Sequence, residues 1–167
     1  MYEARKICNF LLANFDAVEF DLTNLRINKL LFFIQAGALR QMPEGLIRNH
    51  FEAWQFGPVI KPVFDAFKIH KESPITGPAE FLDYASGQRI PVPFDDIREE
   101  HRKIIVREFK AYSHFTTGQL VSLSHEANGP WDIVYRAQLA DATLSPRIPN
   151  QLIREHFAGE RKSTVRH

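Results

Sequence analysis

Cysteine is almost absent from this chain, because Cys8 is the only one among its 167 residues. A single thiol excludes an internal disulfide and any metal cluster built from several thiolates. Long apolar runs are missing as well: the longest, residues 30–34, is far shorter than the ~20 residues that a membrane-spanning helix needs. The sequence therefore predicts a soluble protein of the reducing cytoplasm that does not enter a membrane.

An excess of charge of one sign is also lacking, since 21 basic residues stand against 20 acidic ones and the net charge is +1. Proteins that bind nucleic acid usually carry a strongly basic face or domain. Only the tail, residues 159–167, is locally rich in basic side chains. Binding to nucleic acid is therefore unexpected, and this tail is the one place where the sequence leaves it open.

The remaining composition is that of an ordinary globular protein, with 44% apolar and 25% charged residues. A chain of 167 residues fits one domain with room for a core. No internal repeat, low-complexity tract or interdomain linker is evident. We therefore expect residues 1–167 to form a single domain.

Apolar residues recur mostly at the three- and four-residue spacing of amphipathic helices. The stretch 23–41 is apolar on most sides, which is typical of a buried central helix. Pro62 and Pro149 suit the first turn of a helix, where a missing N–H costs nothing. The helices predicted in this way cover residues 2–15, 23–41, 62–70, 95–112, 116–124, 131–135 and 149–158. The predicted fold is all-α or mainly α, a compact bundle of six or seven short helices.

Two segments do not follow the helical spacing. Residues 49–56 alternate loosely before Gly57-Pro58, which predicts an extended connector or one small strand pair. Residues 72–94 contain four prolines and two glycines, which predicts a long loop. Long loops in compact domains often bind ligands or partners, so this loop is a candidate binding element.

Residue patterns that carry catalytic chemistry are lacking too. The seven histidines are scattered without the i, i+4 pair of a helical zinc site, and His101, on an apolar helix face, is predicted to be a core residue. No glycine-flanked serine elbow or phosphate-binding loop is present. Cys8 lies on an inward helix face, where an inert thiol is expected. We therefore predict no catalytic residue, no metal site and no cofactor, and a protein that acts by binding another protein.

Three segments carry aromatic and proline residues in a specific order. They are LTNLRINKLLFF at residues 22–33, FEAWQFGPV at residues 51–59, and LVSLSHEANGPW at residues 120–131. Trp54 and Trp131 by themselves favour a structural role, because each buries a large area and needs a partner for its indole N–H, while a recognition surface is the alternative, since tryptophan is common at interfaces. Together the three segments resemble the Panacea domain, the SocA-like family of bacterial antitoxins and proteolytic adaptors.

The resemblance covers residues 1–135, and the helix at 149–158 also resembles the closing helix of the family. It implies a helical antitoxin that binds and neutralises a cognate toxin encoded beside it, and for some members delivery of that toxin to an AAA+ protease. Phe33 and Phe56 stand where tyrosine is commoner in the family. The stretch 79–94 is longer than the family pattern suggests.

The residues predicted to contact a partner are those of the aromatic and loop segments. They are Trp54, Gln55, Phe56, Arg89, Phe94, His125 and Trp131. Two other functions stay open at this point: a regulatory nucleic-acid-binding module of a toxin–antitoxin or mobile-element locus, and a hydrolase that uses His125 and Glu126.

Overall fold

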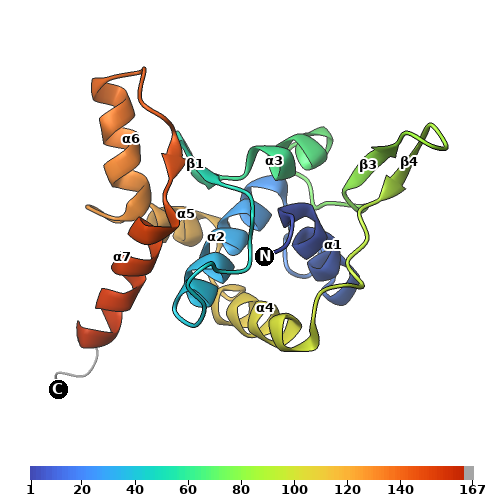
Figure 1. Cartoon of the computed structure of the whole chain (residues 1–167), viewed down its shortest axis with the longest axis horizontal. Helices are drawn as coiled ribbons and strands as arrows, with labels where there is room; N and C mark the ends of the chain where they lie inside the picture. Colours follow the sequence, from blue (N-terminus) through green and yellow to red (C-terminus); the bar gives the residue numbers. More distant parts are fainter. Residues whose placement is uncertain (164–167) are drawn as a thin grey trace.

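The computed structural model describes residues 1–163, and helices dominate its architecture (Figure 1). A short 3-10 helix, η1 (Lys68–His70), continues α3. The α-helices are α1 (Ala4–Asn14), α2 (Asn24–Leu39), α3 (Lys61–Phe67), α4 (Glu99–Tyr112), α5 (Thr117–Ser124), α6 (Pro130–Ala140) and α7 (Asn150–Ser163). The mainly α fold class is confirmed, whereas a purely α fold is wrong because two small β-sheets are present.

Helix α2 is the centre of the core, as its apolar sequence predicts. Thr23 caps it by accepting a hydrogen bond from the backbone N–H of Arg26, and nearly every residue of the helix is buried. The neighbouring helices α3, α4, α5 and α7 pack around it. Aromatic contacts join these helices: the ring of Phe33, for example, stacks on that of Tyr112 from α4 at 4.3 Å.

The first sheet has three antiparallel strands in the order β2-β1-β5. Strands β1 (Phe51–Trp54) and β2 (Gly57–Val59) form a tight hairpin in which Trp54 pairs with Gly57. Strand β5 (Arg147–Ile148) adds to β1 from the far end of the chain. The predicted strand pair is therefore present, but it has a third strand that local spacing does not indicate.

The second sheet lies inside the segment predicted as a loop, and that prediction is wrong for residues 80–91. Strands β3 (Glu80–Asp83) and β4 (Gln88–Pro91) form an antiparallel hairpin that extends from one end of the molecule (Figure 1). Its turn is closed by the Asp83 carboxylate, which accepts hydrogen bonds from the backbone and side chain of Ser86. A local turn of this kind overrides the breaking effect of the flanking prolines and glycines.

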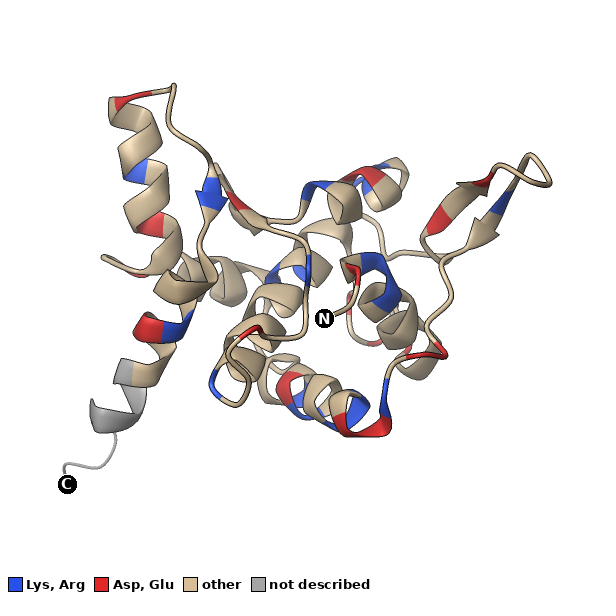
Figure 2. Cartoon of the chain, viewed as in Figure 1, with Lys and Arg blue, Asp and Glu red and all other residues tan. Residues whose placement is uncertain are grey.

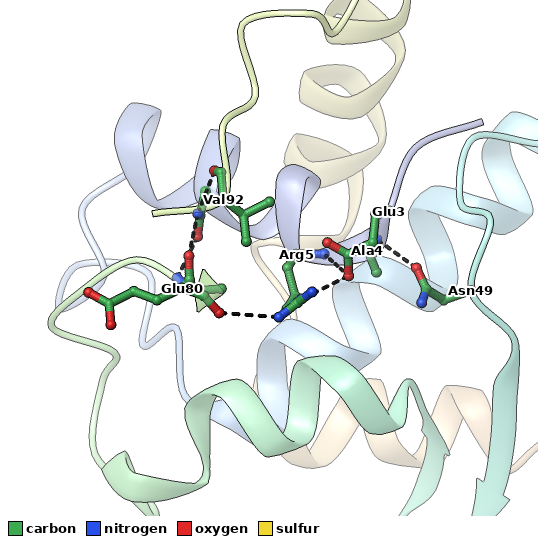
Figure 3. A network of polar contacts seen from close by, with 8 residues as sticks. Glu3, Ala4, Arg5, Asn49, Glu80 and Val92 are labelled. Atoms are coloured by element: carbon green, nitrogen blue, oxygen red, sulfur yellow. Dashed lines mark hydrogen bonds and ion pairs between the residues drawn. The ribbon is translucent and has the colours of Figure 1, made fainter. Parts of the chain in front are cut away.

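Helix α1 holds the base of this second hairpin (Figure 3). The Arg5 guanidinium donates to the Glu80 carbonyl at 3.2 Å and also pairs with the Glu3 carboxylate. The buried Asn9 amide donates to the Ala79 and Val92 carbonyls and accepts from the Ala79 N–H. The hairpin is therefore fixed at its base while its tip is exposed.

Three helices differ clearly from their predicted bounds. Helix α4 begins at Glu99 rather than at residue 95, and the Asp96 carboxylate just before it pairs with Lys6. Helix α6 continues to Ala140, beyond the predicted end at residue 135. Helix α7 continues to Ser163, beyond the predicted end at residue 158. The side chains of the predicted basic tail, residues 159–167, lie outside the part of the chain that the structure describes.

Other predictions about the core are confirmed. Cys8 is fully buried, and His101 is buried with its Nδ1 2.7 Å from the Tyr2 hydroxyl. Thr116 caps α5 through a capping box with Gln119. Among the described residues, no helix has the length and apolar character needed to cross a membrane.

Candidate functional site

A groove lies between the start of α2, the β1–β2 turn and the α3–η1 segment. Its volume is about 670 Å³, and most of its wall is apolar. Its lining includes Leu25, Trp54, Phe56, Phe64, Lys68 and Lys71. We call it the aromatic groove.

Two aromatic side chains form one wall of the aromatic groove. The rings of Trp54 and Phe64 meet edge to face at 5.0 Å, and Trp54 Nε1 donates to the Glu52 carboxylate at 2.8 Å. At the rim, Phe56 is 63% exposed and Leu25 is 37% exposed. A cluster of exposed large apolar side chains beside a hollow is typical of a binding surface.

The β1–β2 turn that carries Trp54 and Phe56 is held from beneath by hydrogen bonds from distant elements. Lys29 Nζ donates to the Pro58 carbonyl at 2.9 Å, and Asn28 Oδ1 accepts from the Ile60 N–H at 2.9 Å. Trp131 Nε1 donates to the Trp54 carbonyl at 2.8 Å. These donors and acceptors come from the three motif segments, so the motifs converge on one turn.

Among the residues that hold the β1–β2 turn, Lys29 is unusual, since a lysine side chain with no exposed surface is rare. Burial lowers its pKa from 10.5 to about 7. Gly57 allows the close approach, because a Cβ atom there would lie 2.7 Å from Lys29 Cε and 2.8 Å from Ser124 Oγ. Gly57 also has a φ of 102°, which side chains disfavour.

His125 and Trp131 lie behind the turn. The two rings stack at 3.7 Å, and Trp131 stacks on Tyr135 at 4.6 Å. Burial lowers the pKa of His125, and the nearby Lys29 lowers it further. Both effects favour the neutral form of the imidazole that stacks on the indole ring.

The hydrolase alternative depends on His125 acting together with Glu126. The Glu126 carboxylate instead pairs with His156 at 3.1 Å. The hydroxyl of Ser124 donates to the Val121 carbonyl. Within the described residues, no group of three His, Cys, Asp or Glu side chains is placed to hold a metal ion. Among the described residues around His125, neither Ser124 nor Glu126 forms with it the nucleophile–base pair or the oriented base that this alternative requires.

The seven predicted contact residues fall into separate places. Trp54, Gln55 and Phe56 line the aromatic groove, and His125 and Trp131 support it. Arg89 is exposed on β4 of the second hairpin. Phe94 lies against Phe10 and lines a smaller hollow beside α1. The structure thus brings five of the seven together and leaves Arg89 and Phe94 apart from them.

Sequence reasoning did not select Leu25, Phe64 or Lys71, which also line the groove. The Phe64 ring meets Trp54 from a different element, and nothing local in the sequence indicates this contact. Along the ribbon of the described residues, lysine and arginine positions alternate with acidic ones on most elements (Figure 2). This distribution does not favour the nucleic-acid alternative, whose basic tail has its side chains outside the described residues.

Replacing Trp131 with phenylalanine is expected to lower the free energy of unfolding by about 1–2 kcal/mol, because the hydrogen bond to the Trp54 carbonyl is lost. The measurement is urea unfolding followed by circular dichroism. Tyr135→Phe is the matched control, since it keeps the ring stack of the Tyr135 side chain and should change stability by less than about 0.5 kcal/mol. Equal losses in the two variants would contradict the support ascribed to Trp131.

Known proteins provide an independent comparison. Residues 27–132, more than half of the chain, match the family described as antitoxin SocA-like, Panacea domain. Antitoxin SocA of Caulobacter vibrioides (strain NA1000 / CB15N) is 31% identical over 164 residues, which cover 96% of this chain and 85% of that protein. No solved structure matches the chain significantly. The matched range includes Lys29, Gly57 and Trp131, which hold the turn of the aromatic groove.

Proposed function

The chain belongs to the SocA-like family of Panacea-domain antitoxins, as its three motifs predict, and on this premise we propose that it neutralises a toxin by binding it directly. The antitoxin role follows from the family. Direct binding, as opposed to action on the expression or the target of the toxin, is the further step. The observation that supports this step is the aromatic groove, a mainly apolar hollow with exposed Phe56 and Leu25 at its rim.

Several features of the groove support protein binding. Phe56 and Leu25 expose apolar surface that water solvates poorly, and Trp54 combines a broad apolar ring with limited side-chain freedom. The turn that carries them is fixed by the hydrogen bonds of Lys29 and Trp131. A pre-organised surface binds more tightly because less freedom is lost when the complex forms.

The test is co-expression of this chain with the product of the adjacent gene in a heterologous bacterium. The neighbour alone should stop growth, and co-expression should restore it and yield a complex that copurifies. A neighbour that is harmless alone, or lethal whether or not this chain is present, would contradict the proposal.

We also propose that this chain acts in the cytoplasm. Its buried free thiol, Cys8, is compatible with that reducing compartment. It also includes the second step that the resemblance implies, delivery of the bound toxin to an AAA+ protease. A shorter lifetime of the toxin in cells that contain this chain, lost when the protease is deleted, is the expected result. An unchanged lifetime would limit the role of the chain to binding.

A further inference from the structure

We propose that the aromatic groove is the toxin-binding surface, and that it receives a helix or loop of the toxin presenting apolar side chains beside an acidic one. This inference rests on the function proposed above. It adds the place of contact and the chemistry of the partner segment.

The asparagine side chains that line the groove are hydrogen-bonded within the protein. Asn24 Nδ2 donates to the Phe64 carbonyl, and Asn28 donates to the Asn24 carbonyl and accepts from the Ile60 N–H. These groups are therefore occupied within the protein and leave little to orient a polar small molecule. The exposed surface that remains is mainly apolar, so it fits apolar side chains of a partner.

The free edge of strand β2 is not open to the addition of a partner β-strand. Strand β2 is at the edge of its sheet, and an open edge would offer unpaired backbone groups to a partner strand. Here Lys29 Nζ binds the Pro58 carbonyl, and Asn28 Oδ1 binds the N–H of Ile60 just beyond the strand. Because side chains of α2 occupy these groups, the partner must bind through its own side chains.

Two lysines, Lys68 and Lys71, lie among the residues that line the groove. Lys68 is paired with Asp65 at 3.1 Å, whereas the Lys71 side chain makes no ion pair or hydrogen bond with the residues whose side chains are described. Lys71 lines the groove and has a φ of 53°, which is uncommon for a residue other than glycine. Glu72 lines the groove beside Lys71, so the rim carries charges of both signs, and the Lys71 ammonium group is the part of the rim that fits a carboxylate on the partner.

The experiment measures the dissociation constant between the purified full chain and the product of the adjacent gene. Phe56→Ser should weaken binding by about 30-fold, the size typical of an aromatic hot spot. Lys71→Glu should weaken it by about tenfold and should reduce the effect of added salt on the affinity. Phe56 and Lys71 are exposed, so both variants are expected to keep the wild-type unfolding midpoint.

Two matched variants change the same chemistry elsewhere. Tyr84→Ser removes a 91% exposed aromatic ring from the tip of the second hairpin, and Lys103→Glu reverses a charge on α4, which contributes nothing to the groove. Both should bind like the wild type. Groove variants that also bind like the wild type, or a loss confined to Tyr84→Ser, would overturn this inference while the proposed function stands. Failure of the wild type to bind would instead contradict the proposed function.

Discussion

Gly57→Ala is expected to lower the free energy of unfolding by about 3–5 kcal/mol, which combines backbone strain with overpacking. The new methyl group would lie 2.7 Å from Lys29 Cε and 2.8 Å from Ser124 Oγ, closer than non-bonded atoms approach. The φ of 102° adds strain for any residue with a Cβ atom. Neither neighbour moves freely. Lys29 is fully buried and donates to the Pro58 carbonyl, and the buried Ser124 hydroxyl donates to the Val121 carbonyl.

Gly87→Ala is the matched control for this prediction. Gly87 also has a positive φ, 69°, but nothing lies within 4 Å of the position that a Cβ atom would take. Only the strain of the left-handed backbone applies there, so we expect a loss of about 1 kcal/mol. Urea unfolding of both variants gives the comparison. Similar losses would show that crowding beneath the β1–β2 turn is not what makes Gly57 necessary.

The second large effect concerns Lys29 and pH. Burial lowers the pKa of Lys29 from 10.5 to about 7, so between these values the unfolded chain binds more protons than the folded chain. Stability therefore rises with pH across that window, and the slope approaches about 1.4 kcal/mol per pH unit. From about pH 7 to about pH 9 the wild type should gain about 2 kcal/mol from this group.

Lys29→Met removes the titrating group while keeping most of its volume, and the gain should disappear. Burial raises the pKa of the Cys8 thiol, so Cys8 lowers stability as pH rises toward and above 9.0. This effect is common to both proteins and cancels in the comparison. The measurement is the free energy of unfolding at several pH values in that range. The same rise in both proteins would contradict the titration ascribed to Lys29.

The helices were largely predictable because each depends on local spacing and local caps. Thr23 and Thr116 begin α2 and α5 as their side chains predict. The β3–β4 hairpin was not predicted because prolines and glycines suggested a loop, whereas the bonds of Asp83 to Ser86 and of Asn9 to the hairpin base decide the structure. Only the first of these interactions is local in sequence.

The site was predictable only in part, because its residues come from elements that are far apart in the sequence. Trp54 and Phe56 are identifiable from their motif, but the groove also requires Phe64 and Lys71 from another element. A buried lysine in an apolar helix, Lys29, was visible in the sequence as a polar residue between apolar ones. Its role depends on the Pro58 carbonyl, 29 residues away, which no local pattern identifies as its partner.

Hydrogen–deuterium exchange of the chain, free and in complex with the product of the adjacent gene, tests whether the toxin binds in the aromatic groove. Amides of residues 54–59 and 64–72, which surround the aromatic groove, should exchange more slowly in the complex. The exposed hairpin tip at 84–87 should exchange alike in both. Protection at that tip, with none around the groove, would contradict binding of the toxin in the aromatic groove.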